Sequence, residues 1–289
     1  MVFKRDLDEK IVKYLTQDKG TIGAQLKASI KEILHRSPHI TCEIRPKNEI
    51  HIYDGPARIA IKLNGLKNTP PYIQFDINNE YFDNIENDIT IRETLKFFNN
   101  VPYQDSYKNI VKHVRKAFRK AKVHSKANGA EGMIEGIFVK QCRLFPKHFY
   151  PIDRQFKHPN HPGSRIDVVG IHEDSKLIYF EIKLNGDNRS DTEFNQQLIK
   201  YNELIKDTDA QIEIAESYKI AYEQRYKYLG EESYKNFIEE KNINWEKIKT
   251  SPPKLILLLA GYSEEEVNHF IKIADGKYEI QSFLLNTVK

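Results

Sequence analysis

Residues 165–184 read RIDVVGIHEDSKLIYFEIKL, and the predicted fold follows from the pattern of this segment. Residues 165–172 are an apolar run interrupted by one acid, Asp167, and a polar turn leads into a second apolar run at 176–184. Two such runs joined by a short polar turn predict two antiparallel strands. The acid needs a reason, because an unpaired buried charge costs several kcal/mol.

The second run places two more charged residues beside that acid. Side chains alternate across a strand, so Glu181 and Lys183 share one face, opposite an apolar row made of Ile178, Phe180, Ile182 and Leu184. The hairpin brings Asp167 alongside them. A divalent cation such as Mg²⁺ or Mn²⁺, which prefers oxygen ligands, is a partner for two carboxylates. Its bound water can attack a phosphodiester, and a lysine can orient that water or offset the developing charge.

The spacing acid-x-Lys is weak by itself, because other parts of the chain repeat it. Only Glu181-x-Lys183 ends a strongly apolar strand and follows a strand with an isolated acid. The structural alternative is a pair of ion pairs at a buried edge. The other matches are Asp8-x-Lys10, Asp174-x-Lys176, Glu239-x-Lys241 and Asp275-x-Lys277.

A family resemblance appears at these residues. Ile166-Asp167, thirteen residues and then Glu181-Ile182-Lys183 resemble the signature of the PD-(D/E)XK nuclease superfamily. QLIKY at 197–201 is similar to the Q-L-x-x-Y helix motif of RecB-type nuclease domains. Gly129-Ala130-Glu131 resembles the helix that supplies another metal ligand in many members. The resemblance covers roughly 127–210 and the strand at 254–260, and it departs from the literal signature where Ile replaces Pro before the first acid.

The resemblance implies a metal-binding set and a catalytic set. The implied metal ligands are Asp167, Glu181, the carbonyl of Ile182, and Glu131. Glu135 lies one helical turn from Glu131 on the same face and is the alternative ligand from that helix. The implied catalytic residues are Asp167, Glu181, Lys183, Gln197, Glu131 and Tyr201. For Gln197 and Tyr201 an ordinary polar helix surface is the alternative.

Hydrophobic periodicity and turn residues divide the chain into three regions. Residues 1–105 predict an α+β accessory module with strands near 41–45, 50–53, 57–63 and 72–77. Residues 106–126 predict a basic helix or linker. Residues 127–289 predict the nuclease domain, with a helical insertion at about 211–248. The expected fold class is α/β: a restriction-endonuclease-like mixed central sheet flanked by helices.

The basic region is the expected contact for nucleic acid. Lys and Arg are frequent between residues 108 and 126, and no acid lies among them. Such a block neutralises phosphates, although a solvated helix face is the alternative. The predicted nucleic-acid-binding residues are Lys112, Arg115, Lys116, Arg119, Lys120 and Lys122, together with Arg165.

Composition excludes several other classes. The sequence has 289 residues, 30% charged residues, a net charge of +4 and only two cysteines, with no Walker A loop and no cysteine set for an iron–sulfur cluster. No apolar run reaches the roughly 18–20 residues of a membrane span, and the first residues do not resemble a secretory signal. A cytoplasmic location without membrane contact is therefore expected.

These observations predict a Mg²⁺- or Mn²⁺-dependent deoxyribonuclease with DNA as its partner. Three alternatives stay open: a non-catalytic nucleic-acid-binding module on the same fold, an RNA nuclease, and an interaction protein in which the charged residues form ion pairs. Cutting both DNA strands would need two active sites and hence a homodimer. A protein partner could bind through the N-terminal module.

Overall fold

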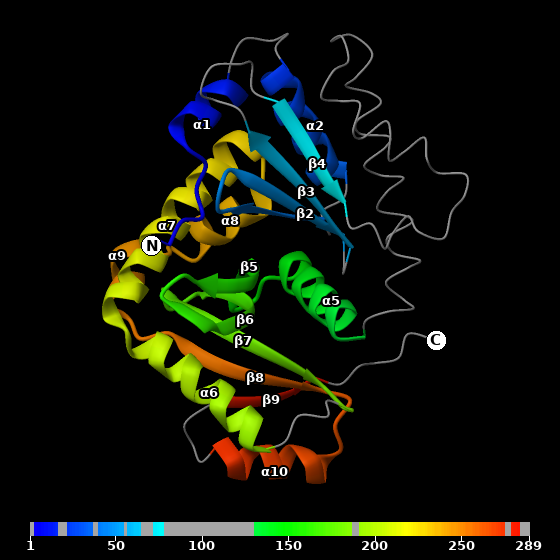
Figure 1. Ribbon diagram of the computed structural model, residues 1–289, viewed down its shortest axis with the longest axis vertical. Coiled ribbons are helices and arrows are strands. Elements are labelled where there is room, and N and C mark those ends of the chain that lie inside the picture. The colour runs from blue at the N-terminus through cyan, green and yellow to red at the C-terminus, as the bar shows by residue number, and fades with distance from the viewer. Residues whose placement is uncertain are drawn as a thin grey trace, which may run out of the picture. The chain divides into compact units, whose positions relative to one another are not determined.

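The computed structural model describes residues 3–16, 22–36, 40–54, 57–64, 72–77, 130–186, 191–274 and 279–283 (Figure 1). The chain divides into two compact units. One unit comprises residues 1–3, 130–216 and 237–289, and the other comprises residues 4–129 and 217–236. The predicted basic helix at 106–126 lies outside the described residues. No helix within the described ranges combines the length and apolar character that crossing a membrane requires.

The first unit is built on a five-stranded sheet in the order β5-β6-β7-β8-β9. The strands β5, β6 and β7 are antiparallel neighbours, whereas β7, β8 and β9 run parallel. A mixed sheet with helices confirms the expected α/β class at this level. The strand bounds are β5 (Phe149–His158), β6 (His161–His172), β7 (Lys176–Leu184), β8 (Lys254–Ala260) and β9 (Glu279–Phe283).

Helix α5 (Ala130–Leu144) covers the apolar face of this sheet. Its residues Ile134 and Phe138 pack in one buried cluster with the even-numbered row of β7, as the alternation of that strand predicts. The interior strand β8, KLILLLA, is apolar and buried at every position after Lys254, as a strand with both faces covered is expected to be. Helix α6 (Asp191–Lys206) lies on the opposite side of the strands from α5 (Figure 1).

Further helices follow where the sequence predicts an inserted pair at 211–248. They are α7 (Thr208–Gln224), the π-helical turn η2 (Arg225–Leu229), α8 (Glu232–Glu240) and α9 (Trp245–Thr250), and α10 (Glu264–Ala274) precedes β9. Residues 217–236 of this stretch belong to the second unit, an assignment that the sequence does not indicate.

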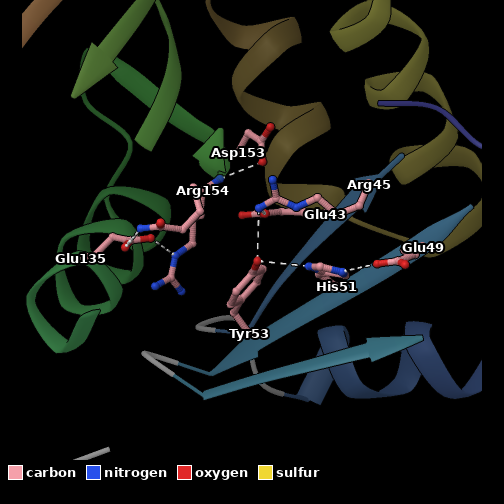
Figure 2. A network of polar contacts seen from close by, with 9 residues as sticks. Glu43, Arg45, Glu49, His51, Tyr53, Glu135, Asp153 and Arg154 are labelled. Carbon is pink, nitrogen blue, oxygen red and sulfur yellow. Dashed lines mark hydrogen bonds and ion pairs between the residues drawn. The ribbon is translucent and has the colours of Figure 1, made fainter. Parts of the chain in front are cut away.

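The second unit contains α1 (Glu9–Leu15), α2 (Ile22–Arg36) and an antiparallel sheet in the order β1-β2-β3-β4. Its strands, β1 (Thr41–Arg45), β2 (Glu49–Asp54), β3 (Ala57–Asn64) and β4 (Tyr72–Ile77), lie where the sequence places them. One face of β1 and β2 is apolar, and the other carries a chain of polar contacts, shown in Figure 2. The chain runs through Glu49, His51, Tyr53, Arg45 and Glu43.

Candidate active site

The site begins where two strands stop pairing. The ladder between β6 and β7 ends at the pair Val168–Phe180, so Asp167 and Ile182 lie just beyond it. In place of a backbone partner, the Ile182 N–H donates to Asp167 Oδ2 at 2.8 Å. The acid that interrupts β6 therefore satisfies an amide that the parted strands leave without a carbonyl.

Glu181 lies on the polar face of β7 and is 2% exposed. Its Oε1 accepts from the ammonium of Lys183, which is also 2% exposed, and from Gln197 Nε2 at 2.9 Å. Its Oε2 accepts from the hydroxyl of Tyr201 at 2.6 Å. The two residues of the Q-L-x-x-Y stretch thus reach the acid and lysine of β7, as the one-turn spacing on α6 predicts.

Tyr201 also fixes α6 against β6. Its hydroxyl lies 2.5 Å from the carbonyl of Arg165, and it accepts from Gln197 Nε2. Because a hydroxyl has one proton, it donates to either Glu181 or the Arg165 carbonyl at any moment. A second bond, from Ser164 Oγ to the carbonyl of Lys200 at 2.9 Å, joins the same helix and strand.

Helix α5 contributes Glu135, which is 3% exposed. Its Oε1 accepts from Arg154 Nε at 2.6 Å, an ion pair shown in Figure 2, and its Oε2 accepts from Gln155 Nε2 at 2.6 Å. Glu131, the preferred ligand from the sequence, lies on the same helix, but its side chain is outside the described part of the chain. The structure places Glu135 at the site.

These side chains line one pocket of about 260 Å³. Arg165, predicted to contact nucleic acid, is exposed and lies in its wall. The other predicted phosphate contacts, at residues 112–122, are outside the described residues. The lining residues are Gly132, Glu135, Gln155, Arg165, Asp167, Glu181, Lys183 and Gln197.

The pocket concentrates negative charge around Asp167. Burial, and next the charge of Glu181, raise the pKa of the Asp167 carboxyl well above its usual value; the charge of Glu135 acts in the same direction, and the Ile182 amide and Lys183 oppose it. A cation near Asp167 would relieve this repulsion. The three carboxylates in the pocket wall are oxygen donors of the kind that a hard divalent ion prefers.

The acids are not gathered into a preformed metal cluster. Within the described residues, no three His, Cys, Asp or Glu side chains converge closely enough to hold an ion. Glu181 is paired with Lys183, and Glu135 is paired with Arg154. A cation that binds through Glu181 Oε1 therefore competes with the Lys183 ammonium for that oxygen.

Comparison with known proteins finds similar solved structures at low similarity. One is the complex of EndoMS with double-stranded DNA, at 10% identity and a TM-score of 0.29, covering 85% of this chain and 77% of that chain. Another is a repair endonuclease from Pyrococcus abyssi, at 12% identity and a TM-score of 0.28, covering 89% of this chain and 95% of that chain. No family model and no curated protein matches the chain. Structural likeness this weak carries no functional conclusion, and the functional evidence is the pocket itself.

Sequence reasoning missed the contribution of β5. Asp153, Arg154 and Gln155 are three consecutive polar residues in a strand that is otherwise mostly buried. Asp153 and Arg154 are 2% and 4% exposed. A polar run in a strand with covered neighbours indicates internal partners, because buried polar groups are normally hydrogen-bonded. That signal was available in the sequence, although it does not name the partners.

Proposed function

We propose that this protein is a metal-dependent nuclease that hydrolyses DNA phosphodiester bonds at the pocket between β5, β6, β7 and α6. The observation that carries the proposal is the meeting of Asp167, Glu181 and Lys183, from two strands that part, in one pocket reached by Gln197. An exposed arginine, Arg165, stands in the same wall. The PD-(D/E)XK resemblance belongs to this proposal as well, since the same residues carry it.

Asp167 and Glu181 would hold the divalent cation, which supplies a water of lowered pKa when bound. In a strand, the N–H and C=O of one residue point to the same side. The Ile182 N–H points to Asp167, so we expect the Ile182 carbonyl to face the same gap, in keeping with its assignment as a ligand. The contribution of Glu131 stays a prediction.

Lys183 has two arrangements available in this proposal. In the pocket as described it neutralises Glu181. When cation charge takes that place, the ammonium is free to orient water or to offset charge on the phosphate. Gln197 and Tyr201 keep Glu181 oriented in either arrangement, because they donate to it from a helix that is fixed on β6. Arg165 would hold a phosphate by charge and hydrogen bonds.

A non-catalytic nucleic-acid-binding protein is the second candidate function. The observation that favours it is that Glu181 and Glu135 already have basic partners, so the charges of these two acids are neutralised without a cation. An RNA substrate, a homodimer and a protein partner for the N-terminal unit stay predictions of the sequence.

The test is cleavage of supercoiled, linear double-stranded and single-stranded DNA, and of single-stranded RNA, in Mg²⁺, Mn²⁺ or EDTA. Wild type is compared with Lys183→Met and with Lys241→Met, a control lysine in an ion pair with Glu173 outside the pocket. The proposal expects cutting of DNA that EDTA and Lys183→Met abolish and Lys241→Met retains. Metal-independent binding without any cutting would establish the second candidate, and cutting of RNA alone would correct the substrate.

A further inference from the structure

Gln155 has an unusual backbone for a residue in a strand. Its φ is 52°, in the left-handed region that favours glycine. It lies opposite Asp167, between the paired positions Arg154–Val168 and Phe156–Ile166. Non-glycine residues held in this region cluster at functional sites, because the surrounding structure must enforce them. The conformation coincides here with a place in the pocket wall.

The side-chain amide of Gln155 is oriented by acids. Its Nε2 donates to Glu135 Oε2 at 2.6 Å and lies 3.5 Å from Asp167 Oδ1, at the limit of a hydrogen bond. The reversed amide would turn its oxygen toward the same two carboxylates, which repel it. The hydrogen-bond network therefore determines which atom is nitrogen and which is oxygen.

This orientation leaves the amide oxygen without a donor. Gln155 Oε1 is buried, and it accepts no hydrogen bond from the described part of the chain. A buried acceptor without a partner is unfavourable, so each case in a folded protein needs an explanation. A phosphodiester offers only acceptors and cannot satisfy it. A cation or a water bound to a cation can, and three carboxylates, those of Glu135, Asp167 and Glu181, line the same pocket as Gln155.

We propose that Gln155 binds the hydrated divalent cation of this pocket through Oε1, while its Nε2 holds Glu135 beside Asp167. This inference rests on the proposed metal-dependent function. It adds a neutral oxygen from β5 to the carboxylates of β6 and β7. It also gives the left-handed backbone at this position a purpose, since the residue that adopts it lines the pocket.

The test measures cation binding directly, without nucleic acid. Titration with MnCl2, followed by the electron paramagnetic resonance signal of free Mn²⁺, compares wild type with Gln155→Gly. Glycine accepts the positive φ and removes only the side chain. The matched control is Asn242→Gly, at an exposed residue that also has a positive φ, 50°, and does not line the pocket. We expect Gln155→Gly to weaken Mn²⁺ binding about 10- to 100-fold, the usual effect of losing a supporting polar group, and the control to leave it unchanged.

A charge variant keeps the inference testable if Gln155→Gly does not fold. Gln155→Glu adds a third carboxylate next to Glu135 and Asp167. We expect it to unfold at a lower temperature than wild type in EDTA and to gain more than wild type from added Mn²⁺. Equal thermal shifts with Mn²⁺ in wild type and Gln155→Glu would overturn the inference.

Failure of this inference and failure of the proposed function give different results. If Asp167→Asn abolishes Mn²⁺ binding while Gln155→Gly binds like wild type, only the role of Gln155 is wrong. If wild type binds no Mn²⁺, or if Asp167→Asn binds it like wild type, the metal-dependent function fails and the inference fails with it.

Discussion

Replacing Lys183 by methionine tests the electrostatics of the pocket. Methionine fills nearly the same volume, so the change removes the charge of a side chain that is 2% exposed without opening a large cavity. Removing one partner of a buried ion pair costs about 3–5 kcal/mol, because the other charge stays buried. Glu181 retains two donors, Tyr201 and Gln197, and each offsets part of that cost. We therefore expect the free energy of unfolding in EDTA to fall by about 2–3 kcal/mol.

The assay is urea unfolding followed by fluorescence of the single tryptophan, Trp245, which lies on α9 in the unit that holds the pocket. Lys241→Met is the control, because its partly exposed ion pair with Glu173 should contribute little to stability. The double variant Lys183→Met with Glu181→Gln removes both charges and should recover most of the lost stability, since a buried pair is worth little net.

The single variant Lys183→Met should bind a divalent cation more tightly than wild type, because the Lys183 ammonium no longer competes for Glu181. A cation at about 100 times its dissociation constant contributes about 2.7 kcal/mol, so it should restore the stability of Lys183→Met while the protein stays unable to cut. The prediction is wrong if Lys183→Met is as stable as wild type in EDTA, or if it binds the cation more weakly than wild type.

Three further predictions concern single side chains. Burial, with the charges of Glu181 and Glu135, raises the pKa of Asp167, so the folded protein holds that proton more tightly than the unfolded chain. The contribution of this carboxyl to stability is therefore fully present below the unfolded pKa and is lost as the pH rises through the folded pKa. Asp167→Asn should raise the free energy of unfolding of the cation-free protein at pH 7–8, and this gain over wild type should disappear near pH 4. Urea unfolding across this pH range checks the prediction. A gain that grows toward low pH would contradict the expected direction. Tyr201→Phe should lower the unfolding free energy by about 1–3 kcal/mol, because Glu181 loses a buried donor, and a change below about 0.5 kcal/mol in urea would show that the hydroxyl is dispensable. In the other unit, Arg225→Lys should lower the thermal midpoint, because lysine cannot reproduce the two bonds of 2.6 and 2.7 Å to Glu231; an unchanged midpoint by circular dichroism would exclude a structural role for that geometry.

The sequence predicted the sheet of the first unit because its strands have unambiguous local patterns. The aliphatic run of β8 and the alternating run of β7 each allow one burial pattern, and the structure shows both. The turn between β5 and β6 was less clear. HPNHPG at 158–163 contains two prolines, which are typical of loops, whereas the structure has only a two-residue turn there, with both histidines in strands.

Other features depend on tertiary contacts that local patterns do not contain. Glu131 and Glu135 share a helix face, so spacing alone could not choose between them. The bonds that hold Glu135 at the site come from Arg154 and Gln155 on β5, and helix spacing does not predict them. The positive φ of Gln155 could not be predicted, because glutamine, unlike glycine or asparagine, does not indicate this backbone conformation. Residues 217–236 look like any charged helical stretch, and their place in the second unit follows from long-range packing.

The parting of β6 and β7 leaves one amide proton with a special use. The Ile182 N–H donates to the side-chain carboxylate of Asp167 rather than to a backbone carbonyl of a neighbouring strand. Its nuclear magnetic resonance frequency should therefore follow the ionisation of that carboxylate and the arrival of any cation beside it. Its rate of exchange with deuterated water should slow when the carboxylate is held in place. With a ¹⁵N label at this isoleucine, the Ile182 amide signal reports the ionisation of Asp167 and cation binding in the pocket, without substrate and without an added dye.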